Sequence, residues 1–171
     1  MEQSAQRMPA FEIRSGEVEL AIEIMREVAQ WCIDAGKPMW KLPELSREKL
    51  LRAPRDRQSF LVARVDGAPA ASMILQWHDP GFWPRVRENE SGFLHKLCVR
   101  RSFAGRSLSV LMVQHALGEC RKRGIGYLRL DTAATRPRLC QLYEGMGFAR
   151  VGRTFLDGRD YALYEMKIEE R

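Results

Sequence analysis

Strand-like and helix-like segments alternate along most of the chain, and this alternation restricts the fold to a mixed α/β domain. Apolar residues recur every three or four positions between Glu17 and Ala35, which predicts an amphipathic helix. A hairpin is predicted at Asp66-Gly67, because this dipeptide is typical of a two-residue turn between strands. Residues 92–99 form another predicted strand, and residues 108–117 carry the apolar face of a helix that Gly124 ends.

The remaining segments complete one domain. We expect further strands at residues 11–14, 59–65, 68–77, 125–130, 148–155 and 160–168. A short helix is predicted from Ser46, and another from a Thr135 cap with Pro137 in its first turn. No repeat, linker or low-complexity stretch interrupts this order. A single domain is therefore predicted over residues 1–171, with its core at about 11–168.

Composition places the chain among globular proteins. Of its 171 residues, 45% are hydrophobic and 29% are charged, which is ordinary for a folded domain and argues against wholesale disorder. No apolar run approaches the roughly 18 residues that a membrane-spanning helix needs. The N-terminal residues do not contain the apolar core of a signal peptide. We therefore expect a soluble, cytoplasmic protein without a membrane partner.

Cysteine and histidine spacing indicates neither disulfide bonds nor a metal centre. Cys32, Cys98, Cys120 and Cys140 are widely separated and lie in apolar segments, so buried free thiols are expected. The histidines at positions 78, 95 and 115 lack the spacing of metal ligands. We predict that the protein has no metal site.

Positive charge gathers between residues 100 and 138, in a chain whose formal net charge is +6. Such density attracts anions, but it does not distinguish a polynucleotide from a small phosphorylated cofactor. The chain has no zinc-finger spacing and no aromatic RNA-binding motif. A nucleic-acid-binding protein is therefore the weaker interpretation, and we predict no nucleic-acid partner.

Two motifs resemble those of the GNAT N-acetyltransferase superfamily. The strand at residues 92–99, followed by RRSFAGRSLSVLM at residues 100–112, is similar to the strand, phosphate loop and helix that bind acetyl-CoA. The segment LCQLYEGMGFARVG, residues 139–152, looks like the family's closing Tyr-Glu-x-x-Gly-Phe motif. The resemblance covers residues 11–168 and implies an α/β (α+β) fold with a central mixed, mostly antiparallel twisted sheet. About six or seven strands and about four flanking helices are expected, with the sheet splayed between the strands before and after the long central helix.

The junction at residues 104–109 has the properties of a phosphate site. A helix N-terminus offers unpaired N–H groups and a favourable dipole, and small side chains let a pyrophosphate approach the backbone. The resemblance implies acetyl-CoA as the co-substrate, with strand backbone near Leu97 and Val99 pairing with the pantetheine amides. The expected coenzyme-binding residues are Leu97, Cys98, Val99, Ala104, Gly105, Arg106, Ser107, Leu108, Ser109, Arg136, Leu139 and Tyr143.

Four positions depart from the family pattern. Ala104 stands where the family has Arg or Gln, Ser107 and Ser109 replace glycines, and Arg136 replaces an asparagine. Backbone donors survive a change from glycine to serine, although a left-handed backbone would disfavour it. These departures keep a non-catalytic coenzyme-binding module as an alternative to an enzyme.

Tyr143 is the catalytic residue that the resemblance implies, as the general acid that protonates the departing thiolate. The alternative is a packed tyrosine on the apolar face formed by Leu139 and Leu142. The implied activity is transfer of an acetyl group from acetyl-CoA to the primary amine of a small or amino-acid-like molecule, by direct attack in a ternary complex. Assembly as a homodimer is left open.

Aromatic and acidic side chains suit a cationic amine, but here they follow no motif spacing. The candidates for the acceptor site are Trp40, Trp77, Glu90 and His95. His95 alternates with Leu97 and Val99 in the predicted strand, which favours a packed histidine over a general base. Phe93 occupies the position of the glutamate base that some family members use, so the general base is unassigned.

Overall fold

A computed structural model describes residues 9–170, which form a seven-stranded sheet and four α-helices. The strands are β1 (Phe11–Ser15), β2 (Phe60–Val65), β3 (Ala68–Gln76), β4 (Gly92–Val99), β5 (Tyr127–Ala133), β6 (Ala149–Leu156) and β7 (Arg159–Lys167). The α-helices are α1 (Val18–Asp34), α2 (Arg47–Leu50), α3 (Leu108–Lys122) and α4 (Pro137–Gly145). Short 3₁₀ helices lie at η1 (Leu42–Leu45), η2 (Arg57–Ser59) and η3 (Arg101–Phe103).

The sheet has the strand order β1-β2-β3-β4-β5-β7-β6. All neighbouring strands run antiparallel except β4 and β5, which run parallel. These two strands pair only at residues 92–94 and 128–130, so the rest of β4 has no partner on the β5 side. The predicted mixed, mostly antiparallel sheet, splayed between the strands before and after the long central helix, is therefore confirmed.

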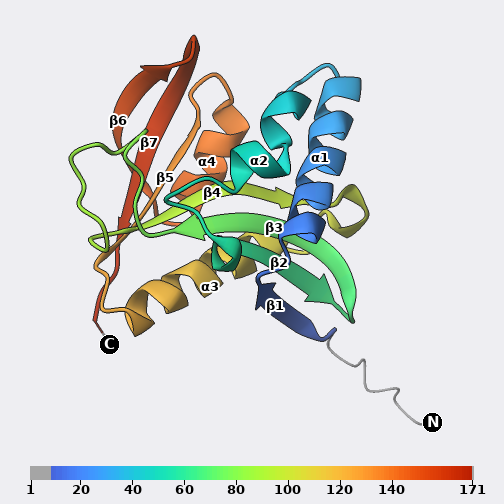
Figure 1. Cartoon of the computed structure of the whole chain (residues 1–171), viewed down its shortest axis with the longest axis horizontal. Coiled ribbons are helices and arrows are strands. Elements are labelled where there is room, and N and C mark those ends of the chain that lie inside the picture. Colours follow the sequence, from blue (N-terminus) through green and yellow to red (C-terminus); the bar gives the residue numbers. More distant parts are fainter. Residues whose placement is uncertain (1–8, 171) are drawn as a thin grey trace.

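Helices cover both faces of the sheet (Figure 1). Helix α1 packs on β2, β3 and β4, whereas α3 packs on the opposite side against β3, β4 and β5. Helix α4 contacts β5 and thus lies on the other side of the splay from α1. None of the helices within residues 9–170 combines the length and the apolar character that crossing a membrane requires.

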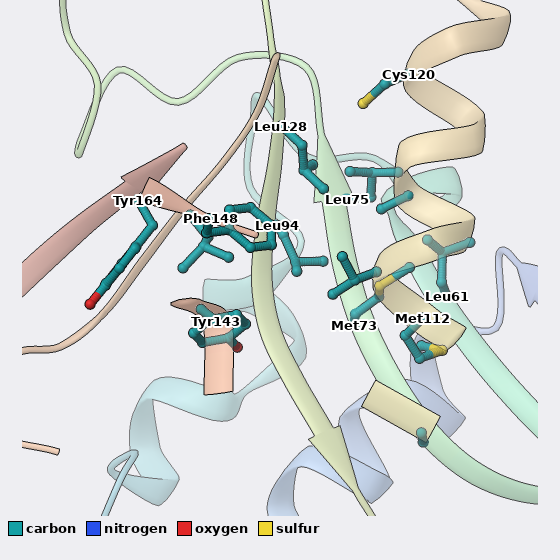
Figure 2. Packing of buried hydrophobic residues seen from close by; sticks show 14 of the residues in the cluster. Leu61, Met73, Leu75, Leu94, Met112, Cys120, Leu128, Tyr143, Phe148 and Tyr164 are labelled. Atoms are coloured by element: carbon teal, nitrogen blue, oxygen red, sulfur yellow. The ribbon is translucent and has the colours of Figure 1, made fainter. Parts of the chain in front are cut away.

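Two apolar clusters hold these layers together. The cluster on the α1 side includes Ile24, Met25 and Phe60, and the larger cluster on the α3 side includes Met73 and Met112. Figure 2 shows that the larger cluster extends from α3 across the sheet to Tyr143, Phe148 and Tyr164. Burying a large apolar side chain contributes about 1.5–3 kcal/mol, so this continuous core connects the C-terminal strands and α4 to the centre of the sheet.

Sequence patterns predicted most boundaries of helices and strands to within a few residues, and the structure corrects two of these predictions. The Ser46 side chain accepts a hydrogen bond from the Lys49 N–H and so caps α2 as predicted. Thr135 does not cap α4. The N-cap residue is Arg136, and its side chain makes no capping hydrogen bond. Strand β5 begins two residues later than predicted and extends to Ala133, because β7 pairs with it along residues 127–133.

The four cysteines are buried and free, which confirms the prediction for their thiols. Burial raises the pKa of Cys98 to about 12 and that of Cys120 to about 12 as well. Cys98 Sγ lies 3.4 Å from Ser72 Oγ, under α1. Its side chain thus belongs to the core, and only its backbone could contribute to the predicted coenzyme site.

Gly92 lies where β4 passes under the end of α3, and replacing it with alanine is expected to destabilise the protein. An added Cβ would approach Cys120 Sγ to 2.6 Å and Trp77 to 3.2 Å. Overpacking of this kind costs about 1–3 kcal/mol. Denaturant unfolding of Gly92→Ala should therefore show a loss of that size in the free energy of unfolding.

Gly118→Ala is the matched control for this prediction. An added Cβ at this position inside α3 would have no neighbour within 4 Å, and alanine stabilises a helix interior by about 0.5–1 kcal/mol relative to glycine. An equal response at both positions would contradict the close packing at Gly92.

Candidate active site

The junction between β4 and α3 exposes backbone donors at the start of a helix. The side chains from Ala104 to Ser107 are exposed, and α3 begins at the buried Leu108. Gly105 and Ser107 both have left-handed backbone, with φ of 78° and 56°. The Ser107 hydroxyl makes no capping hydrogen bond, so the first-turn N–H groups of α3 stay available to an anion.

Arginines at this junction make contacts that fix the turn. Arg100 Nε donates to Glu27 at 2.6 Å, and its Nη2 donates to Glu23 at 3.2 Å, which ties the end of β4 to α1. The Arg101 guanidinium lies 4.0 Å from the Trp31 ring centre, and that of Arg106 lies 5.2 Å from Phe103. Arg101 and Arg106 are exposed and make no ion pair within residues 9–170, so both can attract an anion at long range.

A cavity of about 820 Å³ opens where β4 and β5 diverge, and we call it the β4–β5 cavity. Strand β4 carries a bulge there, at which Lys96 has φ of 54° and the pairing with β3 shifts. The bulge turns His95 and Lys96 toward the same cavity as Leu97. The cavity is lined by Pro38, Met39, Trp40, Lys41, Glu44, Arg55, Phe82, His95, Lys96, Leu97, Asp131, Thr132, Ala133, Thr135, Arg136, Leu139, Tyr143 and residues 155–161.

His95 lies between two carboxylates at the wall of this cavity. Its Nε2 is 2.8 Å from Asp79 Oδ2, and its Nδ1 is 3.3 Å from Asp131 Oδ1. All three side chains are nearly buried, with exposed fractions of 8%, 7% and 11% for His95, Asp79 and Asp131. His95 is thus buried, as expected of a packed histidine, but the strand alternation did not reveal its two acidic neighbours.

The two carboxyl groups differ in their environment. Burial alone would raise the pKa of Asp79, but the hydrogen bond and charge of His95 hold it below its ordinary value. Burial raises the pKa of Asp131, and His95 offsets this only in part. Asp131 Oδ1 is buried without a hydrogen-bond donor among residues 9–170. Asp131 is thus the carboxylate better suited to accept a proton.

Three ligand-type atoms of Asp79, His95 and Asp131 lie within 4.8 Å of one another. We interpret the group as a polar chain, because the two ring nitrogens of His95 face different carboxylates. A single metal ion would engage only one nitrogen of a ring. The absence of a metal site stays a prediction.

Tyr143 of α4 lines the β4–β5 cavity. Figure 2 shows its ring in the core, near Phe148. Its ring centre lies 5.9 Å from that of Phe148 and 6.5 Å from that of Tyr164. Burial raises the pKa of the Tyr143 hydroxyl above its usual range, and the nearby Asp131 adds to the rise. Tyr143 therefore stays protonated at neutral pH, as a proton donor must.

Polar contacts cross the cavity between elements distant in sequence. Arg159 of β7 donates to Glu44 of η1 at 3.2 Å. Arg136 donates to the backbone oxygen of Pro38 at 2.7 Å and also to that of Lys37. These contacts join the segment after α1 to α4 and β7, and they place Arg136 at the edge of the cavity.

The structure brings together some of the predicted site residues and separates others. Trp40, His95, Leu97, Arg136, Leu139 and Tyr143 line the β4–β5 cavity. Trp77 instead lines a second cavity of about 490 Å³ and stacks on Arg123, with 4.1 Å from guanidinium to ring centre. Glu90 is exposed, and its carboxylate accepts a bond from the Arg87 N–H. Neither Trp77 nor Glu90 lines the β4–β5 cavity, so the structure separates them from the other candidates for the acceptor site.

The sequence prediction missed Arg55, Lys96 and Asp131. Lys96 stands in a strand whose other positions are apolar apart from His95, and Asp131 stands near the end of a strand of alternating pattern. A charged residue inside a buried strand is costly without a partner. That signal was present in the sequence, but it did not reveal which charges would meet.

Comparisons with known proteins agree with this geometry. Residues 22–148 match the model of the acetyltransferase (GNAT) family. The uncharacterized N-acetyltransferase YesJ of Bacillus subtilis (strain 168) is 27% identical over 156 residues, covering 85% of this chain and 82% of the relative.

Solved structures share the fold. A GNAT-family acetyltransferase from Listeria monocytogenes superimposes with a TM-score of 0.71 at 21% identity, covering 92% of this chain and 94% of that one. A putative acetyltransferase from Salmonella typhimurium, solved with its cofactor acetyl-CoA, gives 0.65 at 14% identity, covering 95% and 96%. The family match covers most of the described sequence. The chain therefore belongs to the acetyltransferase (GNAT) family and is an acetyl-CoA-dependent acyltransferase.

Proposed function

We propose that the protein transfers an acetyl group from acetyl-CoA to the primary amine of a small molecule, by direct attack in a ternary complex. The observation that carries this proposal is the β4–β5 cavity, which joins a buried, protonated Tyr143 to the buried carboxylate Asp131. One cavity thus holds a proton donor for the leaving group and a proton acceptor for the amine.

The residues at the splay fit acetyl-CoA. The edge of β4 from His95 onward has no partner from β5, so its backbone groups can pair with the pantetheine amides. No heavy atom lies within 4 Å of the Cβ position at Gly105, which leaves room for a phosphate beside the backbone. When bound, acetyl-CoA supplies an acetyl group activated as a thioester. Leu97, Leu139 and Tyr143 would surround the reactive end, and residues 104–109 would hold the pyrophosphate.

On the acceptor side, Asp131 would receive the ammonium group and remove its proton. His95 lies beside Asp131, with 3.3 Å between Nδ1 and Oδ1, and is itself anchored by its hydrogen bond to Asp79. The raised pKa of Asp131 brings it closer to that of an amine, which favours proton transfer. Tyr143 would donate a hydrogen bond to the sulfur as negative charge develops there.

A screen of acceptors tests the choice of substrate class. Small primary amines and amino acids should be acetylated with release of free coenzyme A, whereas peptides and protein tails should react at least tenfold more slowly. The contacts of Arg159 with Glu44 and of Arg136 with Pro38 bridge separate elements that line the cavity, which favours a compact acceptor. Acetylation confined to peptides would contradict the proposal.

Replacing Gly105 with alanine is expected to weaken acetyl-CoA binding. The left-handed backbone at this position costs roughly 1–2 kcal/mol for an L-residue, and about 1.4 kcal/mol corresponds to a tenfold change in affinity. Calorimetric titration should show up to about tenfold weaker binding of acetyl-CoA. Any part of the backbone cost that the free protein already bears should appear as lower stability to unfolding. Gly126→Ala makes the same change at a position without left-handed φ and without a neighbour within 4 Å. An unchanged affinity and stability in Gly105→Ala would show that the turn does not need this backbone conformation.

Assembly as a homodimer and a cytoplasmic location stay predictions. The absence of a nucleic-acid partner is also still a prediction.

A further inference from the structure

Arg55 and Lys96 line the β4–β5 cavity without an ion-pair partner. Neither forms an ion pair with any carboxylate of residues 9–170, although both are half-buried. Burying a cation without a counter-charge is costly, and such positions are uncommon unless they serve a site. These two side chains come from separate elements, the loop after α2 and the bulge of β4.

The Arg55 guanidinium is hydrogen-bonded through its Nε alone among the described residues. Its Nε donates to Gln76 Oε1 at 2.6 Å, and Gln76 Nε2 in turn donates to the backbone oxygen of His78 at 2.7 Å. Gln76 is only 3% exposed, so this support is rigid. The terminal nitrogens of Arg55 have no hydrogen-bond partner among residues 9–170, and the residue lines the β4–β5 cavity.

Lys96 lies near charged groups of both signs, but it forms no ion pair with a carboxylate of residues 9–170. Its Nζ lies 5.0 Å from the centre of the Trp40 ring. Burial lowers the pKa of Lys96 to about 8; Asp131 and Glu44 oppose this fall, while Arg55 and Arg159 add to it. The ammonium therefore lacks a counter-ion in direct contact, and an incoming anion would relieve both burial and repulsion from Arg55.

We propose, on the basis of the acetyl transfer proposed above, that the acceptor is an amino acid whose carboxylate binds Arg55 and Lys96 while its amine faces Asp131. A guanidinium with two free terminal nitrogens matches a carboxylate in a bidentate arrangement. Asp131 and the two cations line the same cavity, so a molecule with both charges close together satisfies all three. An amine without a carboxylate would leave the two half-buried cations unpaired.

The rest of the wall favours an apolar side chain on this amino acid. Phe82 and Tyr161 meet edge to face, with ring centres 4.9 Å apart, and both line the cavity together with Trp40. Aromatic walls of this kind bind large apolar groups. L-phenylalanine is therefore a suitable first probe.

Matched acceptors test the inference in the wild-type protein. For each L-amino acid of a panel that includes phenylalanine, the free acid should have a kcat/KM at least tenfold above those of its amide and of the amine without the carboxyl group. The amide keeps nearly the same shape and removes the negative charge of the carboxylate. Amides or simple amines acetylated as well as the free acids would overturn the inference and leave acetyl transfer intact.

Variants connect the preference to the two cations. Arg55→Gln and Lys96→Met should each raise the KM for L-phenylalanine about tenfold and change that for phenylalaninamide less than about twofold. Lys49→Met removes an exposed lysine of α2 and should change neither. An equal effect on acid and amide would contradict a carboxylate contact.

Calorimetry gives a readout that does not depend on turnover. N-acetyl-L-phenylalanine should bind at least tenfold more tightly than N-acetylphenethylamine to the wild type, and Arg55→Gln should remove this difference. If no compound is acetylated, the proposed function fails, and this binding comparison still decides whether Arg55 and Lys96 bind a carboxylate. Equal affinities would overturn it.

Discussion

Replacing Tyr143 with phenylalanine is expected to lower kcat by roughly 10- to 1,000-fold, in or somewhat below the usual range for acid catalysis, with acetyl-CoA affinity nearly unchanged. The departing thiolate has a conjugate acid with a pKa near about 8.5, and a phenol has one near 10. Donation is thus slightly uphill in water, but a hydrogen bond to the developing charge on sulfur already lowers the barrier. Burial of Tyr143 keeps this donor protonated. Phenylalanine preserves the ring that packs against Phe148.

Tyr164→Phe is the matched control for the loss of a buried hydroxyl. The Tyr164 hydroxyl donates to Glu144 at 2.8 Å and does not line the β4–β5 cavity. Its removal should cost about 1 kcal/mol of stability and leave kcat unchanged. Steady-state and single-turnover rates separate chemistry from product release. An unchanged single-turnover rate in Tyr143→Phe would reassign Tyr143 to packing.

Replacing Asp131 with asparagine is expected to lower kcat/KM for the acceptor by about 100- to 10,000-fold, the usual contribution of a general base. Asparagine has nearly the same shape but cannot accept the proton of the amine. Asp131 faces the cavity, and its buried Oδ1 lacks a hydrogen-bond donor among the described residues. Asp66→Asn is a control in a hairpin turn, where the side chain accepts from the Ala10 N–H and asparagine can do the same. An Asp131→Asn enzyme with normal kcat/KM would exclude Asp131 as base.

The pH profile gives a second readout for Asp131. A base works only when it is deprotonated, and burial raises the pKa of Asp131 above its ordinary value. The kcat/KM of the wild type should therefore fall as the pH drops through this raised pKa, and stay high above it until another group titrates. In Asp131→Asn this acidic limb should disappear. An acidic limb at the same pH in both proteins would assign it to another group.

Much of the fold could be predicted because its signals are local. The hairpin at Asp66-Gly67 and the strand at Gly92–Val99 follow from turn chemistry and apolar patterns over a few residues. The prediction that Thr135 caps α4 was wrong. The preference for a capping residue is weak, and tertiary contacts that hold the turn can override it. Here the Arg136 side chain bonds to the backbone of Pro38 and Lys37, far away in the sequence.

The candidate site was less predictable because it depends on which strands become neighbours. Tyr143 was located by a contiguous motif. His95 and Asp131 lie on β4 and β5, and Asp79 lies in the loop after β3, so only the assembled sheet brings them together. Trp77 illustrates the same limit, because it resembled an acceptor residue by type but lies at the other cavity. The type of a residue indicates which chemistry it can perform, whereas the pairing of distant strands decides which side chains lie close together.

The central claim is tested most directly by following both products of the reaction with purified wild-type protein, acetyl-CoA and a panel of small amines and amino acids. Free coenzyme A, measured by its thiol, and the N-acetylated amine, measured by mass spectrometry, should form in equal amounts. Both should fall together in Tyr143→Phe and in Asp131→Asn. Tight binding of acetyl-CoA without any N-acetylated product above the uncatalysed background would contradict acetyl transfer to small amines. That result would favour a non-catalytic coenzyme-binding module.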